Sequence, residues 1–258
     1  MWDSNSKSLV RNIRNHVPAG RPAAGAAAGP ASRTAAGIPS VGTELIMVRH
    51  SRREEPAEVR DILHAPLTDE GREGARRFGA ALSEALSGGR RYRLYHSPVD
   101  RCAETAGIMA EALPAGRVEG VEEAKFLFRV QARTESFARY MQRDGNNIIN
   151  HWLAGHYPPA EIQAPLEFAQ SVRQAWQSLQ DLHDPGVTSV FVSHDLHTAV
   201  CLYLWTGIFR GSENMIEPMD GFYLEDRGHE LTVVTRDGAK TLAPPYWWNY
   251  GSDEEDRP

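Results

Sequence analysis

Hydrophobic positions between residues 44 and 235 follow two alternating patterns. Short apolar runs bounded by polar residues predict buried strands at 44–48 and 188–192, and two further short strands at 92–95 and 118–121. Apolar residues at helical spacing predict a helix after Thr68, a second helix with Ser97 as its cap and Pro98 as its first residue, and further helices over 165–182 and through Trp205. Two more short runs, 222–224 and 231–234, predict a closing hairpin. This alternation indicates an α/β fold, a three-layer α/β/α sandwich with a mostly parallel central sheet.

The same patterns divide the chain into a leader, one domain and a tail. Residues 18–42 are mostly Ala, Gly, Pro and Ser, and cannot bury enough surface to offset their ordering entropy. We therefore expect 1–43 to be a disordered leader, 44–250 to be the folded domain, and 251–258 to be a solvated acidic tail. Within the domain, the aromatic-rich residues 124–165 predict a small, partly helical cap insertion.

Composition narrows the class of protein. No apolar run approaches the roughly 18 residues of a spanning helix, and no apolar signal core follows the basic residues of the leader, so we expect a cytoplasmic protein without membrane contact. The net charge of −6, without a basic stripe, argues against nucleic acid as a partner. The two cysteines form no C-x-x-C pair, and no phosphate-loop, dinucleotide or H-E-x-x-H motif occurs. A homodimer is compatible with these features.

Candidate chemistry gathers where two of the predicted strands end. Arg49 and His50 follow the apolar run Leu45–Val48, and His194 follows the run 190–192 one residue later. In an open α/β sheet, ligands bind beyond the carboxyl ends of the strands. Two histidines at that edge, one of them flanked by arginine, predict a site for an anionic substrate.

Four motifs in order resemble those of the histidine phosphatase superfamily, which contains cofactor-dependent phosphoglycerate mutases and many phosphatases. They are Arg49-His50 after a strand, the stretch 66–71, the stretch 97–106, and Val192-Ser193-His194-Asp195. The resemblance covers about residues 44–235. It implies that His50 is the nucleophile and forms a phosphohistidine, that Arg49 and Arg101 bind the phosphoryl oxygens, and that His194 donates to them. No metal and no other cofactor is required, since arginines neutralise the charge.

The chain departs from this pattern at two positions. Ser51 stands where the family usually has glycine, so its hydroxyl is expected to bind the phosphate or to restrict access to it. Arg53 stands where the mutase-like branch has a small hydroxyl residue; the acid phosphatase branch has arginine there, and we expect Arg53 to bind phosphate.

Two carboxyls compete for the role of general acid. Glu123 matches the glutamate that the mutase-like branch places just after the third strand, and it is the preferred candidate. Asp195 follows the second histidine, as does the acid of the acid phosphatase branch, and it is the alternative. The favoured reading is a phosphomonoesterase acting on small phosphorylated metabolites. A phosphoglycerate mutase-type phosphotransferase and an inactive module that binds phosphorylated ligands remain alternatives.

Overall fold

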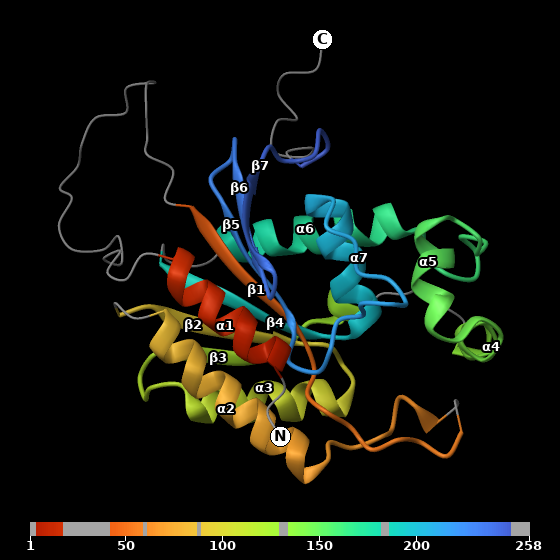
Figure 1. The fold of residues 1–258 in the computed structure, drawn as a ribbon, viewed down its shortest axis with the longest axis horizontal. Coiled ribbons are helices and arrows are strands. Elements are labelled where there is room, and N and C mark those ends of the chain that lie inside the picture. Colours follow the sequence, from red (N-terminus) through yellow and green to blue (C-terminus); the bar gives the residue numbers. More distant parts are fainter. Residues whose placement is uncertain are drawn as a thin grey trace.

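The computed structural model describes residues 4–17, 42–58, 61–86, 89–128, 134–181 and 186–248. A seven-stranded mixed sheet lies in the middle of the molecule (Figure 1). Its strands are β1 (Thr43–Arg49), β2 (Arg91–His96), β3 (Val118–Glu123), β4 (Val187–Ser193), β5 (Gly221–Asp226), β6 (Leu231–Thr235) and β7 (Gly238–Leu242).

The strand order in the sheet is β3-β2-β4-β1-β5-β6-β7. The first four are mutually parallel, and β5, β6 and β7 add to β1 as antiparallel strands. The predicted α/β fold with parallel central strands is therefore confirmed. The predicted closing hairpin is confirmed as β5 and β6, which pair in antiparallel fashion. Strand β7 was not predicted, because its residues, Gly-Ala-Lys-Thr-Leu, have too few large apolar side chains to signal a strand.

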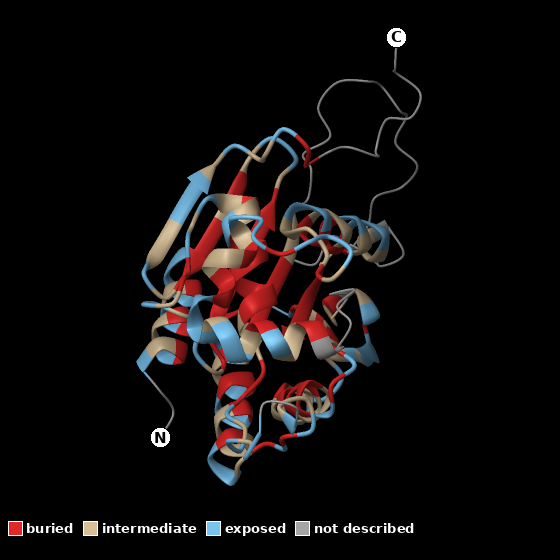
Figure 2. Cartoon of the chain, turned by 90° about the vertical axis from the view of Figure 1, so that its right-hand side faces the viewer, coloured by how far each residue is buried: buried red, intermediate tan, exposed pale blue. Residues whose placement is uncertain are grey.

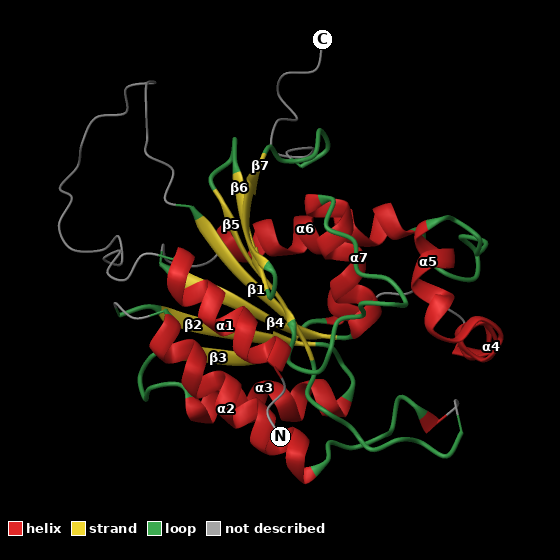
Figure 3. Ribbon diagram, viewed as in Figure 1, coloured by secondary structure: helices red, strands yellow, loops and turns green. Residues whose placement is uncertain are grey.

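Helices cover both faces of the sheet (Figure 3). On one face lie α1 (Ser4–His16), α2 (Asp69–Ala85) and α3 (Asp100–Ala112), and on the other lie α6 (Pro165–Asp181) and α7 (Asp195–Thr206). The alternation of side chains along β1 explains the three layers: Ile46 and Val48 pack with the first group, whereas Leu45 and Met47 pack with the second. Figure 2 shows the strands and the facing sides of these helices as the buried interior.

The N-terminal segment corrects one expectation. Residues 4–16 of the predicted disordered leader form helix α1, whose Leu9 and Ile13 are fully buried against α2 and the sheet. Asn12 also donates two hydrogen bonds of 3.0 Å, to the carbonyls of Thr235 and Arg236. The prediction of disorder rested on the Ala/Gly/Pro-rich composition of 18–42 and was extended to residues 4–16, although these carry an amphipathic helical pattern. Residues 18–41 and the acidic tail lie outside the described residues.

The cap consists of short helices beside α6 and α7 (Figure 1). It contains the 3-10 turns η2 (Lys125–Phe128) and η3 (Gly145–Asn147), and the helices α4 (Thr134–Asp144) and α5 (Ile148–Leu153). This matches the partly helical insertion predicted for the region. No helix in the described parts of the chain has both the length and the apolar character needed to cross a bilayer.

Candidate active site

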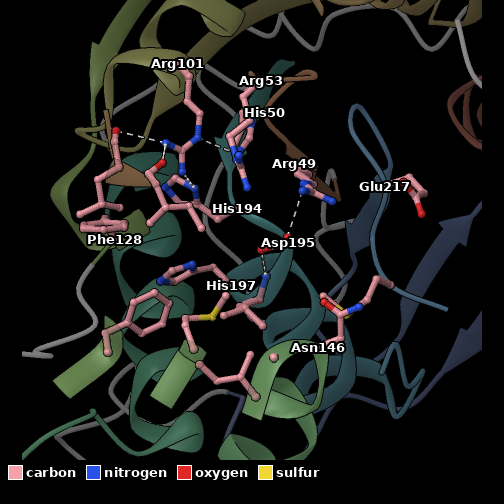
Figure 4. Close-up of a pocket in the computed structure, with 18 of the residues that line it drawn as sticks. Arg49, His50, Arg53, Arg101, Phe128, Asn146, His194, Asp195, His197 and Glu217 are labelled. Carbon is pink, nitrogen blue, oxygen red and sulfur yellow. Dashed lines mark hydrogen bonds and ion pairs between the residues drawn. The ribbon is translucent and has the colours of Figure 1, made fainter. Parts of the chain in front are cut away.

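A cavity of about 370 Å³ opens at the carboxyl ends of β1 and β4 (Figure 4). Its walls come from the segment after β1, from α3, from the start of α7, from the cap and from the segment before β5. It brings together most of the residues predicted from the sequence: Arg49, His50, Arg53, Arg101, His194 and Asp195. Parallel β1 and β4 pair from Leu45 with Ser189 to Arg49 with Ser193, which explains why the two histidines arrive at the same edge.

His50 is the buried group at the inner end of this cavity, with 3% of its surface exposed. Its Nδ1 lies 2.7 Å from the carbonyl oxygen of Ser51, so Nδ1 carries the proton and donates it. Nε2 is therefore unprotonated, and it accepts a 2.9 Å hydrogen bond from Nε of Arg101. Burial, and then the charge of Arg101, lowers the pKa of His50 to about 3. At neutral pH the ring is thus neutral, with its lone pair on Nε2.

Arg101 connects the two histidines. It lies in the first turn of α3, which begins at Asp100, two residues later than the predicted start at Pro98. Besides its bond to His50, its Nη1 donates to the carbonyls of Ile62 and Leu63 at 2.8 and 3.1 Å. Its Nη2 lies 3.3 Å from Nδ1 of His194. The guanidinium is thereby fixed from several sides, in the manner that an arginine fork allows and a lysine does not.

His194 also has a defined tautomer. Because Arg101 can only donate, Nδ1 of His194 accepts, and the proton lies on Nε2, which donates to Oγ of Ser97 at 2.9 Å. Burial and the neighbouring His50 hold the pKa of His194 well below its usual value. Ser97 was predicted to cap α3; its hydroxyl instead orients this histidine, since the cap position is taken by Val99.

Arg49 and Asp195 form an ion pair across the cavity wall. Nη2 of Arg49 lies 3.1 Å from Oδ2 of Asp195, and Nη1 donates to the carbonyl of Ile216 at 2.7 Å. Burial acts to raise the pKa of Asp195, but Arg49 opposes it and the net pKa is lowered. The carboxyl is therefore ionised at neutral pH. This disfavours the alternative in which Asp195 is the general acid.

Ser51 does not reach the cavity, contrary to the expectation that it binds phosphate. Its hydroxyl donates to the carbonyl of Gly71 at 2.6 Å, and its backbone N–H donates to Oγ1 of Thr105 at 3.2 Å. A Cβ added to Gly74 would lie 3.2 Å from the serine Oγ, so glycine at that position leaves room for the serine. Ser51 thus ties the segment after β1 to the start of α2.

Glu123, the preferred general acid, is also not brought to the cavity. It is exposed at the end of β3, where it lies opposite His96 of β2. β3 is the edge strand, and two strands separate it from β1; at a spacing of about 4.8 Å, that places Glu123 about 14 Å from the β1 backbone. It is the last residue of β3, which runs two residues past the predicted end at Val121, and the strand order was not readable from the sequence. The carboxyls lining the cavity are Asp195, Glu55 and Glu217.

Arg53 lines the cavity as predicted, and its side chain contacts one backbone carbonyl and one carboxylate. Its Nη1 donates to the carbonyl of Glu54 at 2.8 Å and lies 3.6 Å from Glu55. A short bridge to Leu67 fixes its backbone. A third histidine, His197, also lines the cavity and was not predicted from the sequence. Its spacing of three residues from His194 on a helix was the available signal, since such residues share a face.

The sequence model of the histidine phosphatase superfamily (branch 1) matches residues 45–217. The chain belongs to this superfamily. The matched region contains His50, Arg101 and His194, while α1, β6 and β7 lie outside it. The superfamily holds phosphatases and mutases, so the family narrows the chemistry to phosphoryl groups without fixing the reaction.

Solved structures with the same fold are distant in sequence, and no curated protein matches the chain. A Bacillus stearothermophilus protein, YhfR, is 22% identical with a TM-score of 0.54, over 77% of this chain and 98% of its own. A mycobacterial glucosyl-3-phosphoglycerate phosphatase, solved with vanadate, is 13% identical with a TM-score of 0.53, over 78% and 97%. A phosphoglycerate mutase from Bacillus anthracis is 14% identical with a TM-score of 0.50, over 80% and 93%. At these identities, the likeness establishes the fold only.

Proposed function

We propose that this histidine phosphatase superfamily member hydrolyses phosphate monoesters through a phosphohistidine on His50. The observation that carries the proposal is the state of His50: Nε2 is unprotonated, its lone pair accepts only a hydrogen bond from Arg101, and the ring lines a cavity beside arginines. An unprotonated imidazole is the form that attacks phosphorus. Arg49, Arg53 and Arg101 supply the positive charge that a phosphoryl dianion needs.

The first step forms the Nε2–P bond and breaks the bond from phosphorus to the ester oxygen, which leaves as an oxyanion and takes its proton from water. Nδ1 of His50 keeps its proton, and the ring gains positive charge. The Ser51 carbonyl that accepts this proton stabilises that charge. In the second step water attacks phosphorus, the N–P electron pair returns to Nε2, and phosphate and a proton are released.

His194 contributes in this scheme only after taking up a proton. Its Nε2–H is used by Ser97 and its Nδ1 accepts from Arg101, so the neutral ring has no N–H left for a phosphoryl oxygen. A dianion bound beside it raises its pKa and favours the doubly protonated ring. The protonated Nδ1–H then donates to the phosphoryl oxygens as charge develops on them.

The positions of the two predicted general acids indicate that the protein hydrolyses esters with good leaving groups best. Asp195 is held ionised by Arg49, and Glu123 does not line the cavity, so neither is placed to protonate a poorly leaving alkoxide. Phenols leave without that help. We therefore expect aryl phosphates to be cleaved faster than alkyl phosphates.

The role of His50 as nucleophile is tested by mixing the protein with a phosphate ester labelled at phosphorus and quenching the reaction rapidly without acid. Wild-type protein should hold label that is lost on mild acid treatment, and His50→Ala should hold none. His96→Ala is the matched control, because His96 makes the same contact of Nδ1 with the next carbonyl, at 2.9 Å, but does not line the cavity. Label retained by His50→Ala would contradict the mechanism.

The same experiment distinguishes the alternatives. A phosphotransferase of the mutase type would pass the label to an added phosphoglycerate in preference to water. A binding module would retain the ester and form neither labelled protein nor free phosphate.

A further inference from the structure

The part of the cavity beyond the arginines is predominantly apolar. The charged groups Arg49, Arg53 and Arg101 lie beside His50. The cap, α7 and the segment before β5 contribute the apolar side chains Phe128, Phe137, Met141, Ile148, Leu196 and Met215, and the polar side chains of Glu55, Asn146 and Glu217 also line the cavity. In a phosphatase, this part of the cavity holds the alcohol that leaves. An apolar wall favours an apolar leaving group over a sugar or a nucleoside, because polar hydroxyls would lose water there without gaining partners.

One buried polar side chain, His197, lies among the apolar ones. His197 lies on α7 one turn after His194, and its ring centre lies 5.0 Å from that of Phe168 and 5.7 Å from that of Phe128. It is 3% exposed, and neither ring nitrogen has a hydrogen-bond partner within the described part of the chain. His197 is labelled in the main cavity in Figure 4. It also borders a smaller apolar cavity, which is lined by Trp152 and Tyr157 as well.

A buried imidazole without a protein partner depends on whatever fills the cavity. Burial lowers the pKa of His197 to about 4, so at neutral pH the ring is neutral, with one N–H donor and one acceptor nitrogen. When an apolar leaving group enters, it displaces any water that reaches the ring. A leaving group with a hydroxyl at the right distance replaces the lost hydrogen bond, whereas one with a methyl there leaves the imidazole unsatisfied.

The distance to be bridged is short. The ring centres of His50 and His194 lie 5.3 Å apart, and those of His194 and His197 lie 5.4 Å apart. A leaving group therefore has to extend only a benzene ring and a few further atoms from phosphorus to place a polar atom beside His197.

We infer that the substrates are phosphate monoesters of mainly apolar alcohols or phenols carrying one distal hydroxyl, and that His197 is the residue that selects this hydroxyl. The inference rests on the proposed phosphatase function and names the class of substrate for the same cavity. His197 acts here as a specificity-determining residue and not as a catalytic one.

A series of para-substituted phenyl phosphates tests the inference on the wild-type protein. The substituents are alkyl chains from ethyl to butyl, each compared with the analogue in which the terminal methyl is replaced by hydroxyl. These phenols differ little in acidity, so kcat/KM reports binding of the substituent. Each added methylene should raise kcat/KM about two- to fourfold until the wall is filled. At one chain length the hydroxyl analogue should exceed its alkyl partner by about tenfold.

Substitution of the histidine tests its role. In His197→Phe, the preference for the hydroxyl analogue at that chain length should fall to below one. The ratio of the two substrates cancels any general loss of activity. His156→Phe is the matched control, because it makes the same change at an exposed cap histidine that does not line the cavity, and its ratio should stay at the wild-type value.

Failure of the inference and failure of the function give different results. If no phenyl phosphate is hydrolysed, the proposed function is wrong and the inference falls with it. If all are hydrolysed but chain length has no effect, or glycerol phosphate is cleaved as well as the alkyl series, the function stands and the apolar class is refuted. If the hydroxyl analogues are never preferred, or His197→Phe keeps the preference, the role of His197 is refuted.

Discussion

Buried neutral histidines make this fold sensitive to acid, and His197 allows the effect to be measured. Its pKa lies near 4 in the folded protein, against an ordinary value of 6.5 in the unfolded chain. As the pH falls below 6.5, the unfolded chain takes up a proton that the folded protein does not. The contribution of His197 to stability is therefore intact above about pH 6.5 and is lost as the pH falls toward 4.

The size of the loss follows from the two pKa values. At pH 5 an unfolded histidine is almost fully protonated while His197 is not, which costs about 2 kcal/mol of unfolding free energy relative to pH 7. His50, whose pKa is lowered to about 3, adds a similar loss, and His194 shifts in the same direction. The losses at His197 and His50 together reach about 4 kcal/mol, a large part of the 5–15 kcal/mol that stabilises a typical domain.

Urea unfolding at pH 7 and pH 5 measures the effect. Removing the titrating group in His197→Phe should reduce the loss between the two pH values by about 2 kcal/mol, whatever the substitution does to stability at pH 7. His229→Phe is the control, because His229 is exposed and the loss should equal that of the wild type. If His197→Phe loses as much stability as the wild type, to within about 0.5 kcal/mol, the imidazole is not buried as a neutral group and the reasoning is refuted.

Three further predictions follow from the geometry. Arg101→Lys should lower kcat/KM for an aryl phosphate about 10- to 100-fold, because an ammonium cannot replace the hydrogen bonds from the guanidinium to both histidines. Steady-state kinetics would measure this decrease in kcat/KM. Ile13→Ala should lower the unfolding free energy by about 2–5 kcal/mol, because Ile13 is fully buried. Arg11→Ala, on the exposed side of α1, should change the unfolding free energy by no more than about 0.5 kcal/mol, and equal effects of the two substitutions would contradict the packing of α1. Glu123→Gln should leave the ratio of alkyl to aryl phosphate hydrolysis unchanged, and a selective loss on the alkyl ester would restore Glu123 as the general acid.

Local chemistry was predictable where it follows directly from a strand. The apolar run before Arg49-His50 and the run before His194 both fixed where the chain leaves the sheet. Pairing of β1 with β4 then placed both histidines at one edge, as expected for parallel strands. The order of the motifs also identified the superfamily.

Features that depend on strand order or on a chosen rotamer were not predictable. Glu123 lies at the end of β3, close to its expected place, but only the sheet order shows that two strands separate it from β1. Ser51 follows His50, yet its hydroxyl turns to the carbonyl of Gly71 because Gly74 leaves space on that side. The sequence contains no signal for either choice, since both depend on contacts between segments far apart in the chain.

Helix α1 has a consequence for the order in which the fold is completed. It is the first element of the chain, yet it contacts β5, β6 and β7, the last strands, as well as α2. Its hydrogen bonds from Ser6 and Asn12 span 212 to 224 residues. During synthesis, α1 and α2 leave the ribosome long before β5, β6 and β7 exist, so the apolar residues of α1 that pack on these strands stay uncovered until the strands have emerged. Docking of α1 on the last three strands is thus a late folding step. In a nascent chain that stalls before β6, the apolar residues of α1 that pack on these strands would remain exposed.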